Sequence, residues 1–278
     1  MFVSNSRKII LPAYRSQKSI GAFNVHNLEI FDAVLQAANK MRVPVIVQLT
    51  PMTLQYFSPA YFRDLAQTAS RIYPEVPLVL HLDHGKDLTQ ILECLEMGFS
   101  SVMVDASDQS LEKNIKITKS VVKAAKRFRV AVEAEVGIMP NHKKVEKIKL
   151  SSITDAKFFI KETGIDFLAM PFGTHHGMDG PEGIEHINFD WLKTVFKEIK
   201  IPLVLHGASG VARDELKRAR LYGVAKVNFD TAIRKMFTNT LRKFLWANPE
   251  EEDLRIYMHA AAGSIEKLVT SKIKALYF

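Results

Sequence analysis

The sequence predicts an α/β protein that forms a single (β/α)8 barrel over residues 1–278, with an additional C-terminal helix. Eight short apolar runs alternate with longer amphipathic segments along the chain. No change of composition and no Pro/Gly-rich linker divides the 278 residues, a length that α/β barrels often reach as one domain. No run is followed by GxGxxG or GxxxxGK[ST], the usual nucleotide-binding signals. Their absence argues against an open doubly wound sheet, which is the alternative fold.

The predicted strands are nearly continuous in apolar character, as strands covered on both faces should be. They are SIGAFNV (19–25), VPVIVQL (43–49), PLVLHLD (77–83), SVMVDA (101–106), RVAVEAEVG (129–137), IDFLAMPFG (165–173), IPLVLHG (201–207) and AKVNFDT (225–231).

The predicted helices follow these runs. The first, 28–41, places Leu28, Phe31, Val34, Leu35, Ala38 and Met41 on one face, with Asn27 before it as an N-cap. Similar segments lie near 59–73, 87–97, 110–128, 154–163, 188–200, 211–222 and 231–247. The last segment, from 253 on, predicts the added C-terminal helix, which could break at Gly263. The stretch 138–153 is predicted to be a long loop after the fifth strand, where loops of that length are often functional.

The composition is that of a globular protein, with 47% hydrophobic and 24% charged residues. A net charge of +8 attracts anions, but the basic residues are spread along the chain, so we expect no nucleic-acid partner. The N-terminus lacks the apolar core of a signal peptide, and no run approaches the roughly 20 residues of a membrane span, so we expect no membrane partner. A single cysteine, Cys94, fits a reducing compartment, and its apolar helix neighbours predict a buried, inert thiol.

Polar residues cluster where the predicted strands end, and active sites of such barrels are built there. In chain order they are His81, Asp83, His84, Asp105, Ser107, Glu133, Glu135, His175, His176, His206, Asn228, Asp230 and Thr231. Three imidazoles from separate strand ends can hold Zn²⁺ and leave a fourth position for substrate. Such a metal would act as a Lewis acid on a carbonyl or enediolate oxygen.

Several roles stay open at this point. Asp83 is either a general acid/base or a group that orients a histidine, and His81 is interpreted as a packing or orienting residue. Glu133 and Glu135 point to one face of their strand, either as site residues or as a buried, paired carboxylate. His175 and His176 compete for one ligand position. A Schiff-base mechanism is disfavoured because the sixth strand has no lysine and Lys226 stands at the start of the eighth.

A phosphate site is predicted near the seventh and eighth strands. The small residues of HGASG (206–210) allow backbone N–H groups to approach an anion, and residues 228–231 precede a helix N-terminus. Barrels often bind phosphate at this place.

These residues resemble the class II, zinc-dependent ketose-bisphosphate aldolases, from about residue 9 to 275. The motifs are GAFNVHNLE (21–29), VLHLDHG (79–85), FSSVMVDAS (99–107), VAVEAEVG (130–137), GTHHG (173–177), PLVLHGASG (202–210) and KVNFDT (226–231). Within the family the chain is most similar to the tagatose- and fructose-bisphosphate aldolases. AFNVHNLE and the pair Thr50-Pro51 lean toward the tagatose branch.

The resemblance implies a cytoplasmic enzyme that reversibly cleaves a ketose 1,6-bisphosphate to dihydroxyacetone phosphate and an aldehyde, glyceraldehyde 3-phosphate. It implies His84, His176 and His206 as zinc ligands, and Asp83 as the acid/base at the C4 oxygen. Asp105 and Glu135 match a secondary metal position. The substrate- and phosphate-binding positions are Asn24, Gly177, Gly207, Ser209, Asn228, Asp230, Thr231 and Arg255.

Two further partners follow from the same resemblance. The glycines Gly177 and Gly207 match contributors to a monovalent-cation site for Na⁺ or K⁺. Arg255, in D-L-R-x-Y, is similar to an arginine that reaches a neighbouring subunit's substrate phosphate. A homodimer or homotetramer is therefore expected.

The segment that follows VEAEVG departs from the family pattern, as does HGxY, in which Asp179 replaces the aromatic residue. After VEAEVG the family has a Gly-Gly turn and an acidic pair, whereas this chain has Pro140, Lys143 and Lys144. Glu146, or alternatively His142, is then the candidate for the catalytic base of that loop. The alternative hypothesis is a non-catalytic paralogue that binds metal and phosphorylated sugar as a regulator or assembly subunit.

Overall fold

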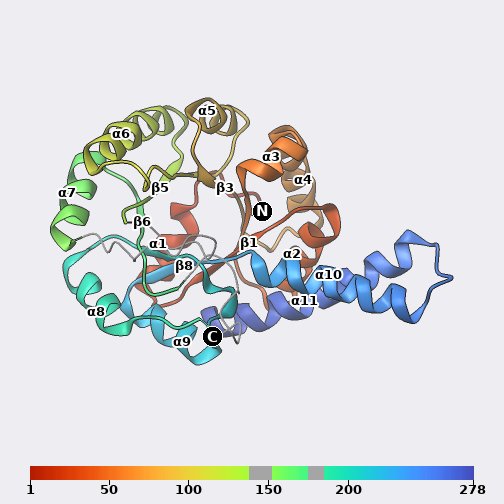
Figure 1. The fold of residues 1–278 in the computed structure, drawn as a ribbon. Coiled ribbons are helices and arrows are strands. Elements are labelled where there is room, and N and C mark those ends of the chain that lie inside the picture. Colours follow the sequence, from red (N-terminus) through yellow and green to blue (C-terminus); the bar gives the residue numbers. More distant parts are fainter. Residues whose placement is uncertain (138–151, 175–184) are drawn as a thin grey trace.

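The computed structural model describes residues 1–137, 152–174 and 185–278, and it forms a closed barrel of eight parallel strands in chain order (Figure 1). The strands are β1 (Ile20–Asn24), β2 (Val45–Leu49), β3 (Leu78–Gly85), β4 (Ser101–Val104), β5 (Ala131–Glu135), β6 (Phe167–Ala169), β7 (Leu203–Leu205) and β8 (Val224–Phe229). Each lies within one of the eight apolar runs or within two residues of it, so the predicted barrel is confirmed.

The chain also forms helices, most of which surround the barrel (Figure 1). They are α1 (Arg7–Arg15), α2 (Leu28–Met41), α3 (Pro51–Tyr56), α4 (Pro59–Ile72), α5 (Leu88–Glu96), α6 (Leu111–Phe128), α7 (Ile153–Thr163), α8 (Phe189–Glu198), α9 (Arg213–Ala219), α10 (Thr231–Ala247) and α11 (Leu254–Tyr277), with short 3₁₀ turns at Ala208–Gly210 and Arg220–Tyr222. The helices α1 and α3 were not expected from the sequence. The suggested break at Gly263 is wrong, because α11 is continuous there and its backbone keeps a helical φ.

Local sequence explains where helices begin. Asn27 has an extended backbone and its side chain accepts a hydrogen bond from the Ile30 amide at 3.0 Å, as predicted for the cap of α2. Ser110, Ser152 and Asn188 cap α6, α7 and α8 in the same way. Cys94 lies buried on α5, as expected.

The barrel interior has an apolar end and a polar end. At the N-terminal ends of the strands, Ile9, Ile10 and Ala13 of α1 pack against apolar strand residues that include Ile20 and Val79. Because successive strand residues alternate between faces, the residues two positions further on also point inward. Polar side chains occupy these positions. The term barrel mouth is used for the end of the barrel at which the strands terminate.

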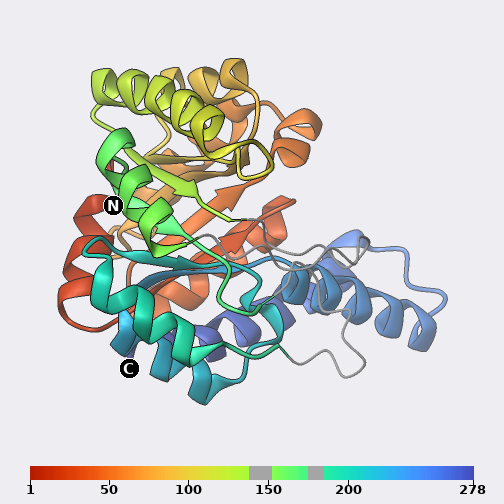
Figure 2. The ribbon, with the colours of Figure 1, turned by 60° about the vertical axis from the view of Figure 1, so that its left-hand side comes forward.

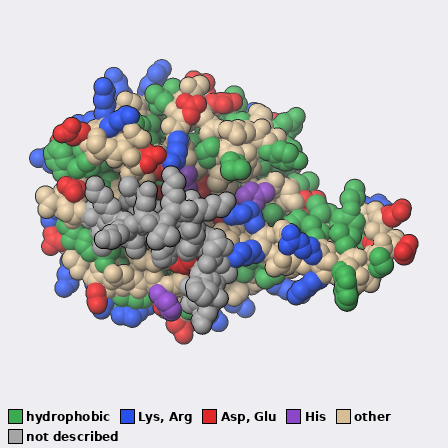
Figure 3. Space-filling model, viewed as in Figure 1, with side chains coloured by type: hydrophobic (Ala, Val, Ile, Leu, Met, Phe, Trp, Pro, Cys, Tyr) green, Lys and Arg blue, Asp and Glu red, His purple; other side chains and the backbone are tan. Residues whose placement is uncertain are grey.

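Helices α10 and α11 pack along each other and form a hairpin that projects from the barrel (Figures 1 and 2). Hydrophobic side chains gather on this hairpin in the space-filling view (Figure 3). Trp246 near its tip has a relative exposure of 88%. No helix within the described residues is both long enough and apolar enough to cross a membrane.

Candidate active site at the barrel mouth

Two consecutive residues at the end of β3, Asp83 and His84, both reach the barrel mouth. Their atoms Oδ1 and Nε2 lie 3.9 Å apart, although neighbouring strand residues normally face opposite sides. A register shift between Leu82 and Gly85 breaks the alternation, and His84 adopts a left-handed backbone with φ 53°. A β-carbon on Gly85 would meet the Met103 carbonyl oxygen at 2.8 Å, so the bulge depends on glycine.

The His84 imidazole is held by a carboxylate of the next strand. Its Nδ1 lies 2.9 Å from Asp105 Oδ2, and Asp105 Oδ1 accepts a hydrogen bond from the Ser107 hydroxyl at 2.8 Å. Burial disfavours the imidazolium, but the charge of Asp83 and the hydrogen bond to Asp105 outweigh it and raise the pKa of His84 to about 10. Without a metal, both His84 nitrogens therefore carry protons.

His206, after β7, is held by a second carboxylate. Its Nε2 lies 2.9 Å from Glu133 Oε1, and both side chains are almost fully buried. Burial lowers the pKa of His206, so its imidazole is neutral. Burial would raise the pKa of Glu133, but the Lys226 ammonium and the hydrogen bond from His206 hold it well below its usual range. His206 Nε2 is therefore the donor, and its Nδ1 carries the lone pair.

The facing nitrogens of the two rings suit a shared metal ion. His206 Nδ1 lies 3.1 Å from His84 Nε2, and the rings are perpendicular. Two nitrogens bound to one tetrahedral zinc ion are about 3.3 Å apart, given Zn–N bonds of about 2.05 Å. A carboxylate on the remaining nitrogen of each ring is the usual arrangement around zinc. The donors present therefore fit zinc, which would replace the proton between the rings.

Two overlapping groups of metal-binding atoms exist among the described residues. Asp83, His84 and His206 form one, and His84, Asp105 and Glu135 form the other, with ligand atoms within 4.8 Å of one another in each. The second group contains the two residues predicted for a secondary metal position.

Three amide side chains surround the Asp83 carboxylate. Asn24 Nδ2 and Gln48 Nε2 donate to Oδ2 at 3.0 Å and 3.3 Å, and Asn228 Nδ2 donates to Oδ1 at 3.2 Å. Burial raises the pKa of Asp83, but the charges of His84 and Lys226 outweigh it, and the pKa is lowered. Asp83 is therefore an ionised, oriented proton acceptor beside the candidate metal site.

The predicted phosphate segment lies where β7 and β8 end. Gly207 has a left-handed backbone, φ 66°, and starts the 3₁₀ turn that contains Ser209. The Ser209 hydroxyl accepts a hydrogen bond from the Ala232 amide at 3.1 Å, which joins this turn to the N-terminus of α10 at Thr231. Small residues beside the N-terminus of a 17-residue helix suit an anion.

The Asp230 carboxylate is contacted by two protein side chains. His26 Nε2 lies 2.9 Å from Oδ1, and Arg234 Nε contacts both oxygens at 3.0 Å. Burial would raise the pKa of Asp230, but these hydrogen bonds lower it. The carboxylate therefore anchors His26 and Arg234 at the mouth.

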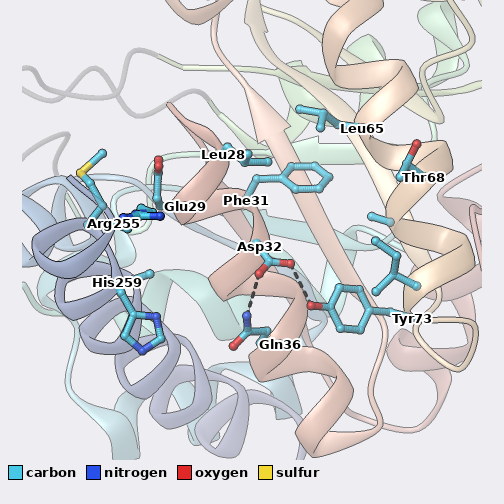
Figure 4. A pocket seen from close by; sticks show the side chains of 14 residues that line it. Leu28, Glu29, Phe31, Asp32, Gln36, Leu65, Thr68, Tyr73, Arg255 and His259 are labelled. Carbon is cyan, nitrogen blue, oxygen red and sulfur yellow. Dashed lines mark hydrogen bonds between the residues drawn. The ribbon is translucent and has the colours of Figure 1, made fainter. Parts of the chain in front are cut away.

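Arg255 lies apart from this cluster, at the start of α11. It lines a groove of about 450 Å³ between α2, α4 and α11, near Glu29 (Figure 4). In the same view the Asp32 carboxylate accepts hydrogen bonds from Gln36 and Tyr73. The predicted residues Glu146, His176 and Gly177, with the alternatives His142 and His175, lie outside the described residues.

For three contributors, sequence reasoning assigned no role or left the role undecided. Gln48 lies within an apolar strand run, and the presence of a single glutamine there is the only sequence feature that could have indicated a role. Lys226 was considered only as a Schiff-base lysine, and it is 1% exposed and paired with Glu133. His26 was not assigned a role, although it lies within a motif that was singled out.

A closed barrel with imidazoles, carboxylates and an anion-binding helix terminus at its mouth is typical of metal-assisted enzymes that act on phosphorylated compounds. The chain belongs to the class II fructose-bisphosphate aldolase family, whose model matches residues 4–277.

Characterised relatives agree with this assignment. The chain is 34% identical to the fructose-bisphosphate aldolase of Thermus caldophilus, covering 96% of this chain and 95% of the relative. It is 34% identical to the D-tagatose-1,6-bisphosphate aldolase subunit GatY of Klebsiella oxytoca, covering 98% and 97%. The crystal structure of the YdjI aldolase of Escherichia coli superposes with a TM-score of 0.85 at 27% identity, covering 99% and 97%.

Proposed function

We propose that this protein catalyses zinc-dependent, reversible aldol cleavage of a ketose 1,6-bisphosphate of the fructose or tagatose type. The products are dihydroxyacetone phosphate and glyceraldehyde 3-phosphate. The observation that carries the proposal is the Asp83 carboxylate, oriented by three amides, 3.9 Å from an imidazole that shares a candidate metal site with His206.

In this proposal His84, His206 and His176 hold the catalytic zinc. Bound there, zinc would supply a Lewis acid for the substrate carbonyl group. Asp105 and Glu135, with His84, offer a second position for a metal.

Asp83 takes the proton of the C4 hydroxyl as the carbon–carbon bond breaks, and returns it in the synthetic direction. Asn24, Gln48 and Asn228 hold the carboxylate in one orientation. The charges of His84 and Lys226 lower its pKa and keep it ionised. Burial excludes water from this proton transfer, because Asp83 is only 4% exposed.

The phosphate of the dihydroxyacetone half is assigned to Gly177, Gly207, Ser209 and the N-terminus of α10 at Thr231. The dipole of that helix favours a negative charge. Arg234, anchored by Asp230, adds positive charge at the same end of the barrel, and the His26 imidazole contacts the same carboxylate. Gly177 and Gly207 are also the proposed contributors to a Na⁺ or K⁺ site.

In this proposal the preference for one ketose bisphosphate over another depends on the segment that follows β5. Lys143 and Lys144 stand in it and favour an anionic substrate group, and Glu146 is the proposed loop base, with His142 as its alternative. A further relative, the 6-phospho-5-dehydro-2-deoxy-D-gluconate aldolase of Bacillus subtilis, is also 34% identical. Its substrate therefore belongs in any test panel.

We further propose a cytoplasmic homodimer or homotetramer in which Arg255 contacts the substrate phosphate of a neighbouring subunit. The position of Arg255 on the projecting hairpin, away from the cluster at its own barrel mouth, supports this assignment. The exposed apolar residues of the hairpin, such as Trp246, support a contact with another subunit.

The central experiment measures triose phosphate release from fructose 1,6-bisphosphate, tagatose 1,6-bisphosphate and the 6-phospho-5-dehydro-2-deoxygluconate substrate, with and without a chelator. We expect chelator-sensitive cleavage that zinc restores, and no cleavage by Asp83→Ala or His206→Ala. Cleavage that resists complete zinc removal, or full activity in either variant, would contradict the proposal. Phosphosugar binding by zinc-loaded protein without turnover would favour the non-catalytic paralogue.

Mixed subunits test the role of Arg255. Asp83→Ala subunits and Arg255→Ala subunits are each expected to be inactive alone. If Arg255 serves a neighbour, mixing the two restores part of the activity, because one site in a hybrid dimer has both residues intact. No recovery, despite hybrid formation seen by native mass spectrometry, would place Arg255 outside the neighbouring site.

A further inference from the structure

Glu133 lies in the barrel interior between a candidate metal ligand and a buried lysine. Its Oε1 accepts a hydrogen bond from His206 Nε2 at 2.9 Å, and its Oε2 accepts one from Lys226 Nζ at 2.8 Å. Glu133 is 0% exposed and Lys226 is 1% exposed. A lysine is almost never fully buried unless it is paired, so this lysine requires a reason.

The same ammonium group has a second partner. Lys226 Nζ lies 3.3 Å from His81 Nε2, and His81 Nδ1 lies 2.7 Å from the Ser101 hydroxyl. An ammonium can only donate, so His81 Nε2 must accept and His81 Nδ1 must carry the ring proton. The row therefore runs from Ser101 through His81, Lys226 and Glu133 to His206, and it joins four strands to the residue that follows β7.

This row of donors and acceptors has one consequence for the metal site. Both Glu133 oxygens accept, so His206 must keep its proton on Nε2 and direct the Nδ1 lone pair at His84 Nε2, 3.1 Å away. Without the lysine, the carboxylate would lose its second anchor and could rotate or shift away from His206.

We infer that Lys226, supported by His81 and Ser101, is a positioning residue that fixes Glu133 and thereby holds His206 in the tautomer and orientation that bind zinc. The inference rests on the proposed zinc site and goes beyond it, because it assigns a role to a lysine that is buried inside the barrel. It also explains why Lys226 is no Schiff-base lysine, since both of its hydrogen-bond partners are interior protein groups.

A purely structural role for the ion pair makes a different prediction. Replacing a buried ion pair with apolar or neutral groups of similar volume is often neutral or stabilising. Metal affinity would then follow overall stability. A positioning role predicts that zinc affinity falls even in a variant whose fold is as stable as that of the wild-type protein.

The test compares four variants with the wild-type protein: Glu133→Gln, Lys226→Met, the double variant of these two, and Ser19→Ala. Ser19 is the control, since it is buried before β1 and its hydroxyl donates to the Val224 carbonyl at 2.6 Å, outside the row. Zinc affinity is measured by chelator competition, the ligand geometry by the visible absorption of cobalt-substituted protein, and stability by thermal unfolding of the metal-free protein.

We expect Lys226→Met to weaken zinc binding about 10- to 100-fold, the usual effect of losing a group that orients a ligand. Glu133→Gln should have a similar effect, and the double variant should bind no more weakly than Glu133→Gln. The cobalt absorption should change in these variants. Ser19→Ala should keep wild-type zinc affinity and the wild-type spectrum even if its unfolding temperature falls.

Unchanged zinc affinity and cobalt spectrum in Lys226→Met would overturn the inference. The comparison of the double variant with Glu133→Gln decides the matter if Lys226→Met fails to fold. The double variant buries neither charge of the pair, and a lysine that has lost its carboxylate partner can be buried as the neutral amine. A further tenfold loss in that comparison would show that Lys226 does not act through Glu133. Failure of the wild-type protein to bind zinc would overturn the proposed zinc site and this inference together.

Discussion

The substitution Asp83→Asn separates proton transfer from structure, because the change keeps the size and shape of the side chain. Asp83 Oδ2 accepts from Asn24 and Gln48, and these two contacts survive if the introduced amide keeps its oxygen on that side. The introduced NH₂ group then faces Asn228, whose Nδ2 donates at present.

The structural cost of this substitution is small. Asn228 Oδ1 is buried and has no hydrogen-bond partner among the described residues, so rotation of the Asn228 amide can present it to the new donor. At most one hydrogen bond is lost, about 1 kcal/mol of stability. Loss of the proton acceptor is expected to lower kcat about 10²- to 10⁴-fold. That corresponds to about 3–5 kcal/mol in the activation free energy.

The assay measures kcat and KM for triose phosphate release, with zinc content and urea-unfolding free energy determined on the same samples. Asp166→Asn is the matched control, since Asp166 lies at the opposite end of the barrel and its carboxylate binds Arg7 and the Val132 amide. The control should keep wild-type kcat. If Asp83→Asn keeps kcat within tenfold of wild type at full zinc content, the assignment of Asp83 as the acid/base is refuted.

Three further predictions follow from single residues. Gly85→Ala should cost about 1–3 kcal/mol of unfolding free energy and weaken zinc binding, because its β-carbon would meet a backbone carbonyl at 2.8 Å beside His84. Gly263→Ala is the control: no atom lies within 4 Å of its β-carbon, so it should stabilise α11 by about 0.5–1 kcal/mol. Equal effects of the two substitutions in urea unfolding would contradict the prediction. The Cys94 thiol should not react with a disulfide reagent at pH 8 in the folded protein, because burial raises its pKa to about 12; rapid labelling without denaturant would be evidence against that burial. The metal-free protein should lose stability below about pH 4, where an unfolded Asp takes up protons. Burial would raise the pKa of Asp105 but the hydrogen bond from His84 lowers it, so the unfolded state binds more protons there, and Asp105→Asn should show a shallower acid dependence of the unfolding free energy.

Local patterns in the sequence were sufficient for the architecture. Eight apolar runs separated by amphipathic segments specify strands and helices through nearby residues alone. Eight consecutive units of this kind are typical of a closed barrel, which the structure shows. The closed barrel then brings polar strand ends to one mouth, which is why Asp83, His84, Asp105 and His206 could be grouped before any coordinates. The helices α1 and α3 could not be predicted in this way, because a short helix has too few periodic positions to be distinguished from a loop.

The tertiary structure alone decided what the inward-facing residues do for one another. Glu133 and Lys226 are 93 residues apart and belong to β5 and β8, which are not neighbours in the barrel, so no local spacing predicts their 2.8 Å contact. The amides of Asn24, Gln48 and Asn228 also reach Asp83 from other strands, β1, β2 and β8, so local spacing does not predict these contacts either. Sequence periodicity determines which face a side chain occupies, whereas the partner across a closed barrel is determined only when all the strands share one interior volume.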